Sequence, residues 1–479
     1  MQKPGDICRE SSSPRLGHRI VRRDFLKLGA LGMALPQILA LRGSAASAAM
    51  AEGGRGFGQA KRCIVLFAWG GISHLDTWDM KPEASAEVRG TFQPIPTTAD
   101  GIQVSEHLPR LAKQAHRLAI VRSVCHAAPS HRSAAYWNLT GHPPPRLNAN
   151  WPATRQDWPC LGSLAAAALE GSGDPRGKPG VLPRAVCLPY HMEDGGRANG
   201  QDGGFLGLGY DPVLMRPPTG REYYGKSPSS GTIDLSLPPG VDLDRMAQRR
   251  SLRDAIESRG AVGALEETAA AASSREQALD MLLQPDVRDA FDLEKEPARL
   301  RASYGDHICG QSTLLARRLT EAGVPMVTVY CSAGDLNGSV GAHFDTHDDN
   351  FNRLKNDMLP PLDQASAALL EDLHQRGTLD ETLVVWLTEF GRTPKINGGA
   401  GRDHYPNCYS VAFAGGGIRG GQVYGASDAV GAEPAEKACG PADLHATIFR
   451  AMGIDPRHVI YDAIGRPLQI CDGKPLPLV

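Results

Sequence analysis

Three stretches of the chain gather carboxylates and imidazoles, which are common ligands of divalent cations in proteins. Each stretch follows or contains the end of an apolar run with the length of a buried strand. The candidate metal ligands in these stretches are His74, Asp76, His343, Asp345, His347, Glu389, Asp403 and His404. We therefore expect a metal centre if the fold brings the three stretches together.

The first two stretches leave alternatives open. In WGGISHLDTWD (69–79), His74 and Asp76 follow two glycines that allow a sharp turn, but an aspartate there could simply cap a turn or helix. In SAGDLNGSVGAHFDTHDDN (332–350), His343, Asp345 and His347 lie within five residues. A solvated loop could also carry them, so we expect at least one of the three to bind metal.

The third stretch contains the sharpest single candidate. Glu389 directly follows the apolar run TLVVWLT (382–388), and Asp403 and His404 come after a glycine-rich connection. A carboxylate at the end of a buried strand is costly unless it is paired or bound to a cation. Arg392, three residues further on, is the alternative partner of Glu389.

The stretch HAAPSHRSAAYWNLTG (126–141) predicts a helix that begins near three candidate catalytic residues: Ser130, His131 and Arg132. Ser130 suits the N-cap position. We expect the helix dipole to lower the pKa of His131, which favours the neutral imidazole needed for metal binding or general-base work. Arg132 could hold an anionic substrate group. In the alternative interpretation, Ser130 merely caps the helix and His131 packs on loop residues.

The elements that must position these residues alternate between strands and helices. Fully buried parallel strands are predicted at 63–69, 117–124, 185–189, 326–331, 382–388 and 409–415, and helices at 312–323, 358–377 and 443–453, the last with an aspartate N-cap. This order predicts an α/β fold with a mostly parallel central sheet and helices on both faces. A charged, alanine-rich stretch from about 240 to 300 predicts a helical insertion. Ligands of such sheets sit beyond the carboxyl ends of the strands.

The composition excludes some classes of protein. The 479 residues include 51 Lys+Arg against 53 Asp+Glu, a net charge of −2, so no global charge points to nucleic acid or to an anionic membrane. The ten cysteines form no C-x-x-C pair, which argues against a zinc ribbon or a thioredoxin-type site. Cys63, Cys125, Cys187 and Cys331 lie in or beside apolar strand-like runs, and we expect them to be buried free thiols.

The first 50 residues resemble a twin-arginine signal peptide rather than part of the fold. Arg22 and Arg23 precede Asp-Phe-Leu-Lys and an apolar run, and Ala46-Ser47-Ala48 fits a cleavage site. The run is short and is broken by Pro36, so we expect no stable membrane span. The resemblance implies the twin-arginine translocase as a partner during export and a periplasmic or extracellular location. Residues 60–479 are then expected to form a single domain.

The stretches GGISHLDTWD, HAAPSHRSAAYWNLTG, HFDTH, TLVVWLTEFGRTP and GRDHYP together resemble the alkaline phosphatase and sulfatase superfamily. With the signal and AGGGIRGG, they closely resemble the exported "domain of unknown function 1501" family, from about residue 60 to the end. The superfamily resemblance implies that Asp76 is the metal aspartate after the first strand. It also places Glu389 as the late-strand ligand, His404 as the final metal histidine, and His343, Asp345 and His347 as the mid-chain ligands.

Two departures from the superfamily pattern bear on activity. Ala127 stands where the sulfatase nucleophile belongs, and Phe390, which cannot ligate, follows Glu389. The first interpretation is a hydrolase of phosphate or sulfate esters, with a small-molecule or glycan ester as substrate and a metal-activated water as nucleophile. Zn²⁺ or Mn²⁺ would suit its histidines and carboxylates. The alternative is a non-catalytic protein of the same fold, with metal, that binds glycans or has a structural role.

Overall fold

The computed structural model describes residues 56–148, 151–177, 180–223, 242–257, 281, 283–332, 335–337 and 343–479. The predicted signal peptide, 1–50, lies outside the described residues. The predicted division of the chain into a signal and a single domain therefore stays a prediction.

An eight-stranded sheet forms the centre of the molecule, in the order β12-β4-β11-β8-β1-β7-β5-β6. Its strands are β1 (Arg62–Ala68), β4 (Leu118–Val124), β5 (Ala185–Leu188), β6 (Val213–Leu214), β7 (Met326–Tyr330), β8 (Thr382–Thr388), β11 (Tyr409–Ala414) and β12 (Gln422–Tyr424). Strand β1 lies in the middle and pairs in parallel with both β7 and β8. The predicted strands are thus present, and the sheet is mostly parallel.

The orientation of β11 differs from the prediction. This strand runs antiparallel to both of its neighbours, β4 and β8, although 409–415 was expected to be parallel. All six residues of β11 are buried, and a continuously apolar strand has the same composition in either direction. Because β11 is reversed, it begins at the edge where β4 and β8 end. The residues that precede it therefore lie at the carboxyl edge of the parallel strands.

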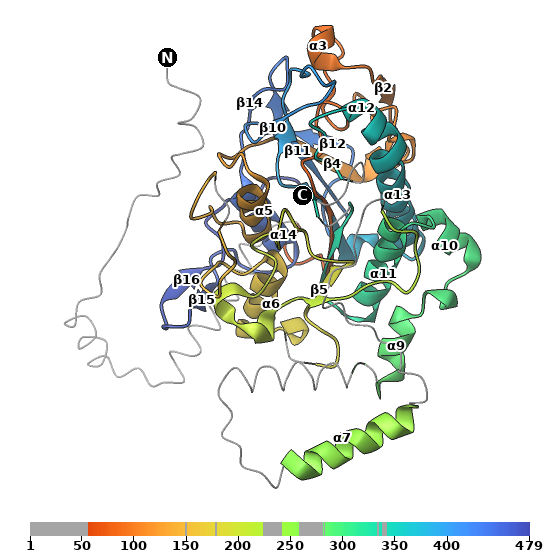
Figure 1. Cartoon of the computed structure of the whole chain (residues 1–479), viewed down its shortest axis with the longest axis vertical. Coiled ribbons are helices and arrows are strands. Elements are labelled where there is room, and N and C mark those ends of the chain that lie inside the picture. Colours follow the sequence, from red (N-terminus) through yellow and green to blue (C-terminus); the bar gives the residue numbers. More distant parts are fainter. Residues whose placement is uncertain are drawn as a thin grey trace, which may run out of the picture.

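Helices cover both faces of the sheet, as predicted (Figure 1). Alternate residues of each strand point to opposite faces, and both faces are apolar, so each has to be covered. Ile64 and Leu66 of β1 pack into one apolar layer with α4 (Pro109–Ala112), α11 (Ile308–Ala322) and α13 (Leu359–Gln375). Val65 and Phe67 pack into the other layer with α5 (His131–Thr140), α6 (Leu161–Gly171) and α14 (Pro441–Ala451).

The three predicted helices begin and end within a few residues of their predicted positions. Helix α11 stops before Gly323, whose φ of 116° is a left-handed conformation that favours glycine. Helix α14 begins at Pro441, so Asp443 is not its N-cap as expected. Asp443 lies in the first turn instead, and its Oδ2 accepts a hydrogen bond from the backbone N–H of Gly440 at 2.9 Å.

The described part of the predicted insertion at about 240–300 is helical. Its elements are α7 (Leu243–Glu257), α9 (Pro285–Phe291) and α10 (Ala298–Tyr304). Helix α7 lies apart from the sheet in Figure 1, whereas Val287 and Tyr304 pack into the apolar layer of α11 and α13. Among the described residues, no helix combines the length and the apolar character needed to cross a bilayer.

Several short elements complete the chain. They are α3 (Ala86–Arg89), the pair β2 (Pro94–Pro96) and β3 (Gln103–Ser105), α12 (Asn350–Arg353), the pair β9 (Gly391–Arg392) and β10 (His404–Tyr405), the pair β13 (Ala426–Ser427) and β14 (Pro434–Glu436), and the pair β15 (Val459–Tyr461) and β16 (Pro467–Gln469).

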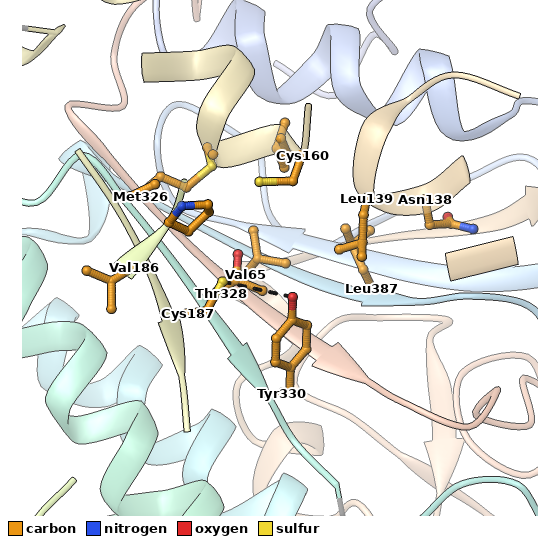
Figure 2. Close-up of a pocket in the computed structure, with 14 residues that line it drawn as sticks. Val65, Asn138, Leu139, Cys160, Val186, Cys187, Met326, Thr328, Tyr330 and Leu387 are labelled. Atoms are coloured by element: carbon orange, nitrogen blue, oxygen red, sulfur yellow. Dashed lines mark hydrogen bonds between the residues drawn. The ribbon is translucent and has the colours of Figure 1, made fainter. Parts of the chain in front are cut away.

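The cysteines of the described residues are buried and free, as predicted for four of them. Cys160 and Cys187 line a small cavity under α5 and α6, where Cys187 Sγ lies 4.0 Å from the hydroxyl of Tyr330 (Figure 2). No carboxylate or imidazole is among the residues that line this cavity. It is therefore part of the packed interior rather than a site of chemistry.

Candidate metal centre

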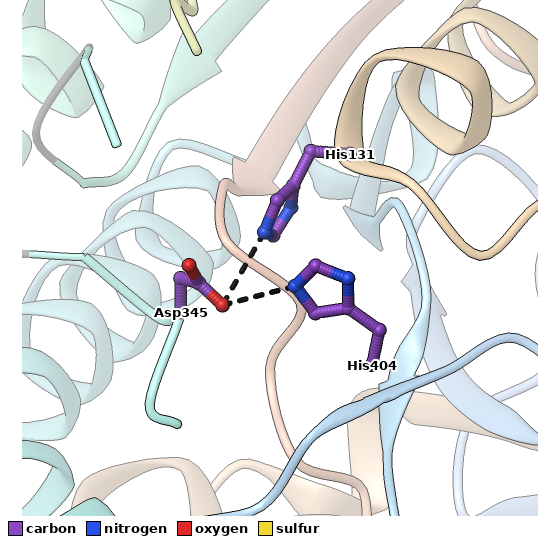
Figure 3. A group of neighbouring side chains, drawn as sticks. All are labelled: His131, Asp345 and His404. Carbon is purple, nitrogen blue, oxygen red and sulfur yellow. Dashed lines mark hydrogen bonds and ion pairs between the residues drawn. The ribbon is translucent and has the colours of Figure 1, made fainter. Parts of the chain in front are cut away.

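Three candidate residues from distant parts of the chain meet at the carboxyl edge of the sheet. His131 is the first residue of α5, Asp345 lies in the segment after β7, and His404 begins β10, which pairs with β9 just after β8. The Nε2 atoms of His131 and His404 lie 3.3 Å and 3.2 Å from the same Asp345 oxygen, Oδ1 (Figure 3). One ligand atom from each residue lies within 4.8 Å of the other two, which is close enough to share one cation.

Each imidazole is anchored through its Nδ1 atom. Nδ1 of His131 lies 2.8 Å from Oε1 of Glu389, and Nδ1 of His404 lies 2.9 Å from the carbonyl oxygen of Pro129. Both partners are acceptors, so we assign the ring protons to Nδ1. The Nε2 atoms then face Asp345, the orientation that a second group gives to a metal-binding histidine.

A third imidazole, His347, extends the cluster toward solvent. Its Nε2 lies 3.1 Å from Asp345 Oδ1 and 2.9 Å from Nε2 of His404, and its Nδ1 lies 2.7 Å from Oδ1 of Asp403. The side chains of His347 and Asp403 are 43% and 51% exposed. His347 is therefore placed to be a further ligand, with Asp403 as the carboxylate that orients it.

Glu389 supports the cluster instead of joining it. Its side chain is fully buried, and Oε1 accepts the backbone N–H of Gly70 at 2.8 Å in addition to the His131 contact. Its carbonyl oxygen is held by the Nε2 of His126 at 2.6 Å and by the Nδ2 of Asn138 at 2.8 Å. Glu389 thus fixes the ring of His131 from behind.

The guanidinium of Arg392 borders the same carboxylate. Its Nη2 lies 2.6 Å from Asp345 Oδ1, and its Nε donates to the carbonyl oxygen of Gly71 at 2.8 Å. Arg392 is fully buried, and it pairs with Asp345 rather than with Glu389, its partner in the alternative interpretation. The buried arginine places a fixed positive charge beside the only carboxylate in the three-residue group.

These charges shift the pKa values in the cluster. Burial would lower the pKa of His131, but its hydrogen bonds to Asp345 and Glu389 raise it to about 9. Burial lowers the pKa of His404 to about 4. Burial would raise the pKa of Asp345, but the three imidazoles and Arg392 hold it well below its usual range. The expected lowering of the His131 pKa is thus wrong, because the interactions with two carboxylates outweigh the effect of burial.

The structure does not bring Asp76 into this group. Both of its carboxylate oxygens are bound by Arg402, at 2.8 Å from Nε and 3.1 Å from Nη2. Ser73 Oγ and Asn350 Nδ2 bind the same carboxylate at 2.6 Å and 3.0 Å. The predicted meeting of Asp76, Glu389 and His404 around one point is therefore corrected: Asp76 forms a fully buried ion pair with Arg402.

His74 and His343 also lie outside the three-residue group. Nε2 of the fully buried His74 lies 2.8 Å from the carbonyl oxygen of Gly431. Nδ1 of His343 accepts the backbone N–H of Asp345 at 3.2 Å. His343 thus shapes the turn that presents Asp345, although it was predicted as a ligand itself.

The start of α5 departs in part from its prediction. Ser130 occupies the N-cap position, but its hydroxyl donates to Ser133 Oγ at 3.0 Å instead of capping a backbone N–H. No described contact joins Ser130 or Arg132 to the His131–Asp345–His404 group. Arg132 extends toward Gly196, where its Nη2 fills the space that a larger residue would need. Of the three predicted catalytic residues, only His131 is in the cluster.

Two aromatic rings close the inner side of the cluster. The ring of Phe390 lies 5.0 Å from that of His131 and 4.7 Å from that of His404, and the ring of Trp69 lies 5.3 Å from that of His131. Phe390 and Trp69 are fully buried. Phe390, which the sequence shows only as a lost ligand, therefore forms an apolar wall that keeps water from this side.

The model of one protein family, described as "Protein of unknown function (DUF1501)", matches residues 60–478. The protein belongs to the DUF1501 family. This confirms the family that the sequence motifs indicate. No curated protein matches the sequence.

Solved structures similar to this DUF1501 protein include Ps i-CgsB in complex with k-i-k-neocarrahexaose, with 13% identity, a TM-score of 0.40, and coverage of 86% of this chain and 75% of that one. The PsFucS1 sulfatase from Pseudoalteromonas sp. has 12% identity, a TM-score of 0.34 and coverage of 88% and 72%. A protein in the alkaline phosphatase superfamily from Vibrio parahaemolyticus has 10% identity, a TM-score of 0.35 and coverage of 84% and 69%.

The sequence did not reveal the residues of this DUF1501 protein that fix the backbone of Glu389 and so support the cluster. His126 and Asn138 fix the backbone of Glu389, and the hydroxyl of Tyr409 donates to Asn138 Oδ1 at 2.8 Å. His126 also accepts the backbone N–H of Ala128 through Nδ1 at 3.1 Å. One signal was available, because His126 lies two residues after the predicted strand 117–124.

Proposed function

We propose that this DUF1501 protein hydrolyses phosphate or sulfate esters with a divalent cation, Zn²⁺ or Mn²⁺, held by His131, Asp345 and His404. The convergence of these three ligand atoms within 4.8 Å carries the proposal. The donors fit such a cation: His131 Nε2 is buried and lies 3.3 Å from a carboxylate oxygen of Asp345. Imidazoles with one carboxylate suit these ions.

A cation bound there supplies Lewis acidity toward an ester oxygen and toward water, which suits a chain with Ala127 in the nucleophile position. The chain's own residues organise the site. Glu389 and the Pro129 carbonyl orient the two buried imidazoles, and Arg392 keeps Asp345 ionised. Because the pKa of His131 is raised, cation binding has to displace a proton from its Nε2.

The exposed side of the cluster gives the direction of approach. Phe390 and Trp69 close the inner side, whereas His347 and Asp403 are about half exposed. We infer that an ester, from a small molecule or a glycan, reaches the cation past His347.

Metal analysis and turnover assays on the same purified protein test this function. We expect bound Zn²⁺ or Mn²⁺, together with turnover of an aryl phosphate, a phosphodiester or an aryl sulfate that a chelator abolishes and added metal restores. His404→Gln should lose metal and turnover. His74→Gln is the matched control, because it changes a buried histidine outside the group, and it should keep both.

Two results would contradict the proposal in different ways. A folded protein without metal after growth and reconstitution in Zn²⁺ and Mn²⁺ would reject the metal centre. A protein with stoichiometric metal but no turnover of any of the three substrates would reject the hydrolase and favour the non-catalytic, glycan-binding or structural alternative.

We also propose that the protein works in the periplasm or outside the cell after twin-arginine export. Arg22, Arg23 and the Ala46-Ser47-Ala48 run support this. Cell fractionation of the full chain and of an Arg22→Lys/Arg23→Lys variant tests it. The unchanged chain should leave the cytoplasm and the variant should stay there, whereas equal export of both would reject this route.

A further inference from the structure

A second surface, away from the metal centre, concentrates exposed apolar side chains. Of the eight exposed large hydrophobic residues in the described part of the chain, four lie on or beside the β15–β16 hairpin: Leu208, Val459, Tyr461 and Ile464. Val459 is 42% exposed and Tyr461 is 62% exposed. Clusters of this kind mark interaction surfaces in soluble proteins. The hairpin lies at the margin of the molecule beside α6 (Figure 1).

A groove runs along this hairpin and leaves room for another strand. It has a volume of about 1450 Å³ and lies between β15, the end of α6 and the 204–210 loop. The carboxylates and the guanidinium in its walls are paired within the chain: Arg155 forms a two-pronged ion pair with Asp211, Glu170 pairs with Arg184, and Asp462 pairs with Arg466. The groove therefore presents no unpaired charge from these residues that would repel an approaching chain.

The outer edge of β15 has free backbone groups. His458 O accepts from Ile470 N–H at 2.9 Å, and Asp462 N–H donates to Arg466 O at 3.2 Å. In an antiparallel pair the bonded residues alternate, so positions 458, 460 and 462 face β16. The N–H and C=O groups of Val459 and Tyr461 then point away from β16. They have no backbone partner among the described residues.

The two edges of the hairpin are protected unequally. Pro467 of β16 lies opposite Tyr461 in a non-hydrogen-bonded pair, so its backbone nitrogen, which carries no hydrogen, faces outward. Proteins commonly place proline or lysine on exposed edges to prevent pairing with another chain. The β15 edge instead carries valine and tyrosine at the outward-bonding positions, so only this edge is open to pairing.

The β15 sequence is complementary to itself when read in the opposite direction. If HVIYD (458–462) pairs with a second copy about a two-fold axis at Ile460, His458 faces Asp462 and Val459 faces Tyr461, each twice. The Val459–Tyr461 pairs are favourable by apolar contact, whereas Asp462 already pairs with Arg466 of its own chain. We propose that this protein forms a symmetric dimer by antiparallel pairing of β15 with β15 of a second copy.

Sedimentation velocity of the purified protein over a wide concentration range tests the dimer. We expect a concentration-dependent dimer whose Kd rises by at least about tenfold in Val459→Pro and in Tyr461→Lys. Neither substitution removes a hairpin hydrogen bond, because both backbone N–H groups point outward. Ile464→Lys is the matched control. It adds the same charge at an 86% exposed position beyond β15, and it should leave the Kd unchanged.

Cysteine cross-linking tests the register. Ile460→Cys places a thiol on the proposed two-fold axis, where it should form a disulfide with the same residue of the second copy under a mild oxidant. Leu468→Cys is the control, because Leu468 lies opposite Ile460 on β16, away from the partner, and should not cross-link.

Three results would overturn the proposal. The first is a protein that stays monomeric at all concentrations, even if a different polypeptide binds to its β15 edge. The second is a dimer that neither Val459→Pro nor Tyr461→Lys weakens. The third is equal cross-linking at positions 460 and 468.

Discussion

The residues around Asp345 show how a few fixed contacts can prepare a cation site. His131, His347 and His404 all use Nδ1 to bind an oxygen acceptor and direct Nε2 toward one carboxylate oxygen. Fixing the far side of a ring leaves the near nitrogen little freedom, so less ordering has to occur when a ligand binds. The orienting acceptors therefore matter to the site nearly as much as the ligands do.

Substitution of Glu389 tests this orienting role. Glu389→Gln keeps an oxygen that can accept one hydrogen bond but removes the charge that faces His131 Nδ1. We expect the Kd for Zn²⁺ to rise by roughly 10–100-fold, as for other groups that orient metal ligands. Competition with a chromogenic chelator measures it. Glu381→Gln, just before the opposite end of β8, is the control, and an equal affinity in both variants would contradict the role.

Substitution of Asp76 tests whether its carboxylate is structural or binds the metal. Asp76→Asn leaves the fully buried guanidinium of Arg402 without its countercharge, so we expect a loss of about 3–5 kcal/mol in the free energy of unfolding. The metal content of the folded protein should not change. Denaturant unfolding and metal analysis measure the two effects. Asp345→Asn is the comparison and should lose metal; loss of metal in folded Asp76→Asn would make Asp76 a ligand after all.

The sequence could indicate the kinds of residue in the site but not their partners. Asp76 and Asp345 both follow buried strands, and each is neutralised by an arginine from the segment after β8. Nothing in the local pattern tells Arg392 from Arg402, because the partner of Asp76 lies 326 positions away along the chain. Composition and spacing find candidate ligands, whereas only the packed fold decides which carboxylates stay available.

At the scale of elements, the reversed strand β11 explains why His404 belongs to the site. The chain leaves β8, forms the β9–β10 pair and enters β11 from the same edge of the sheet. His404, five residues before β11, is therefore held at the edge where β4 ends and α5 begins. The apolar pattern predicted β11 as a strand, but its direction depends on pairing with β4 and β8, which a continuously apolar run does not encode.

The contact between α13 and α4 gives a pH-dependent prediction. Asp363 of α13 is buried and accepts the backbone N–H groups of Leu111 and Arg110, at 2.8 Å and 3.0 Å. Burial raises its pKa from 3.8 to about 6. Between pH 4 and pH 6 the folded state thus binds more protons than the unfolded state, so stability falls as the pH rises through this window.

Comparison with Asp363→Asn isolates this contribution, because the other titrating groups cancel. The unfolding free energy of the unchanged protein minus that of the variant should fall by up to about 3 kcal/mol from pH 4 to pH 7. Urea unfolding at several pH values measures it. A difference that is flat with pH, or that grows as the pH rises, would show that the backbone hydrogen bonds outweigh the effect of burial on this carboxyl group.

At the scale of the whole molecule, the candidate metal centre joins segments that are far apart in the sequence. His131, Asp345 and His404 belong to the connections after β4, after β7 and before β11, and these meet only in the folded sheet. An unfolded chain cannot present the three ligand atoms together, so a cation bound here stabilises only the folded state. Metal binding and global stability should therefore be linked.

Thermal unfolding of the metal-depleted protein measures this link. Zn²⁺ or Mn²⁺ at about 100 times its Kd should add about 2.7 kcal/mol to the free energy of unfolding and raise the midpoint. His404→Gln should show no such rise, whereas His74→Gln should respond as the unchanged protein does. A rise of equal size in His404→Gln would mean that the cation binds elsewhere. Asp76 would not be a ligand of that other site, because Arg402 already neutralises it. The other site would have to consist of groups outside the cluster at the sheet edge.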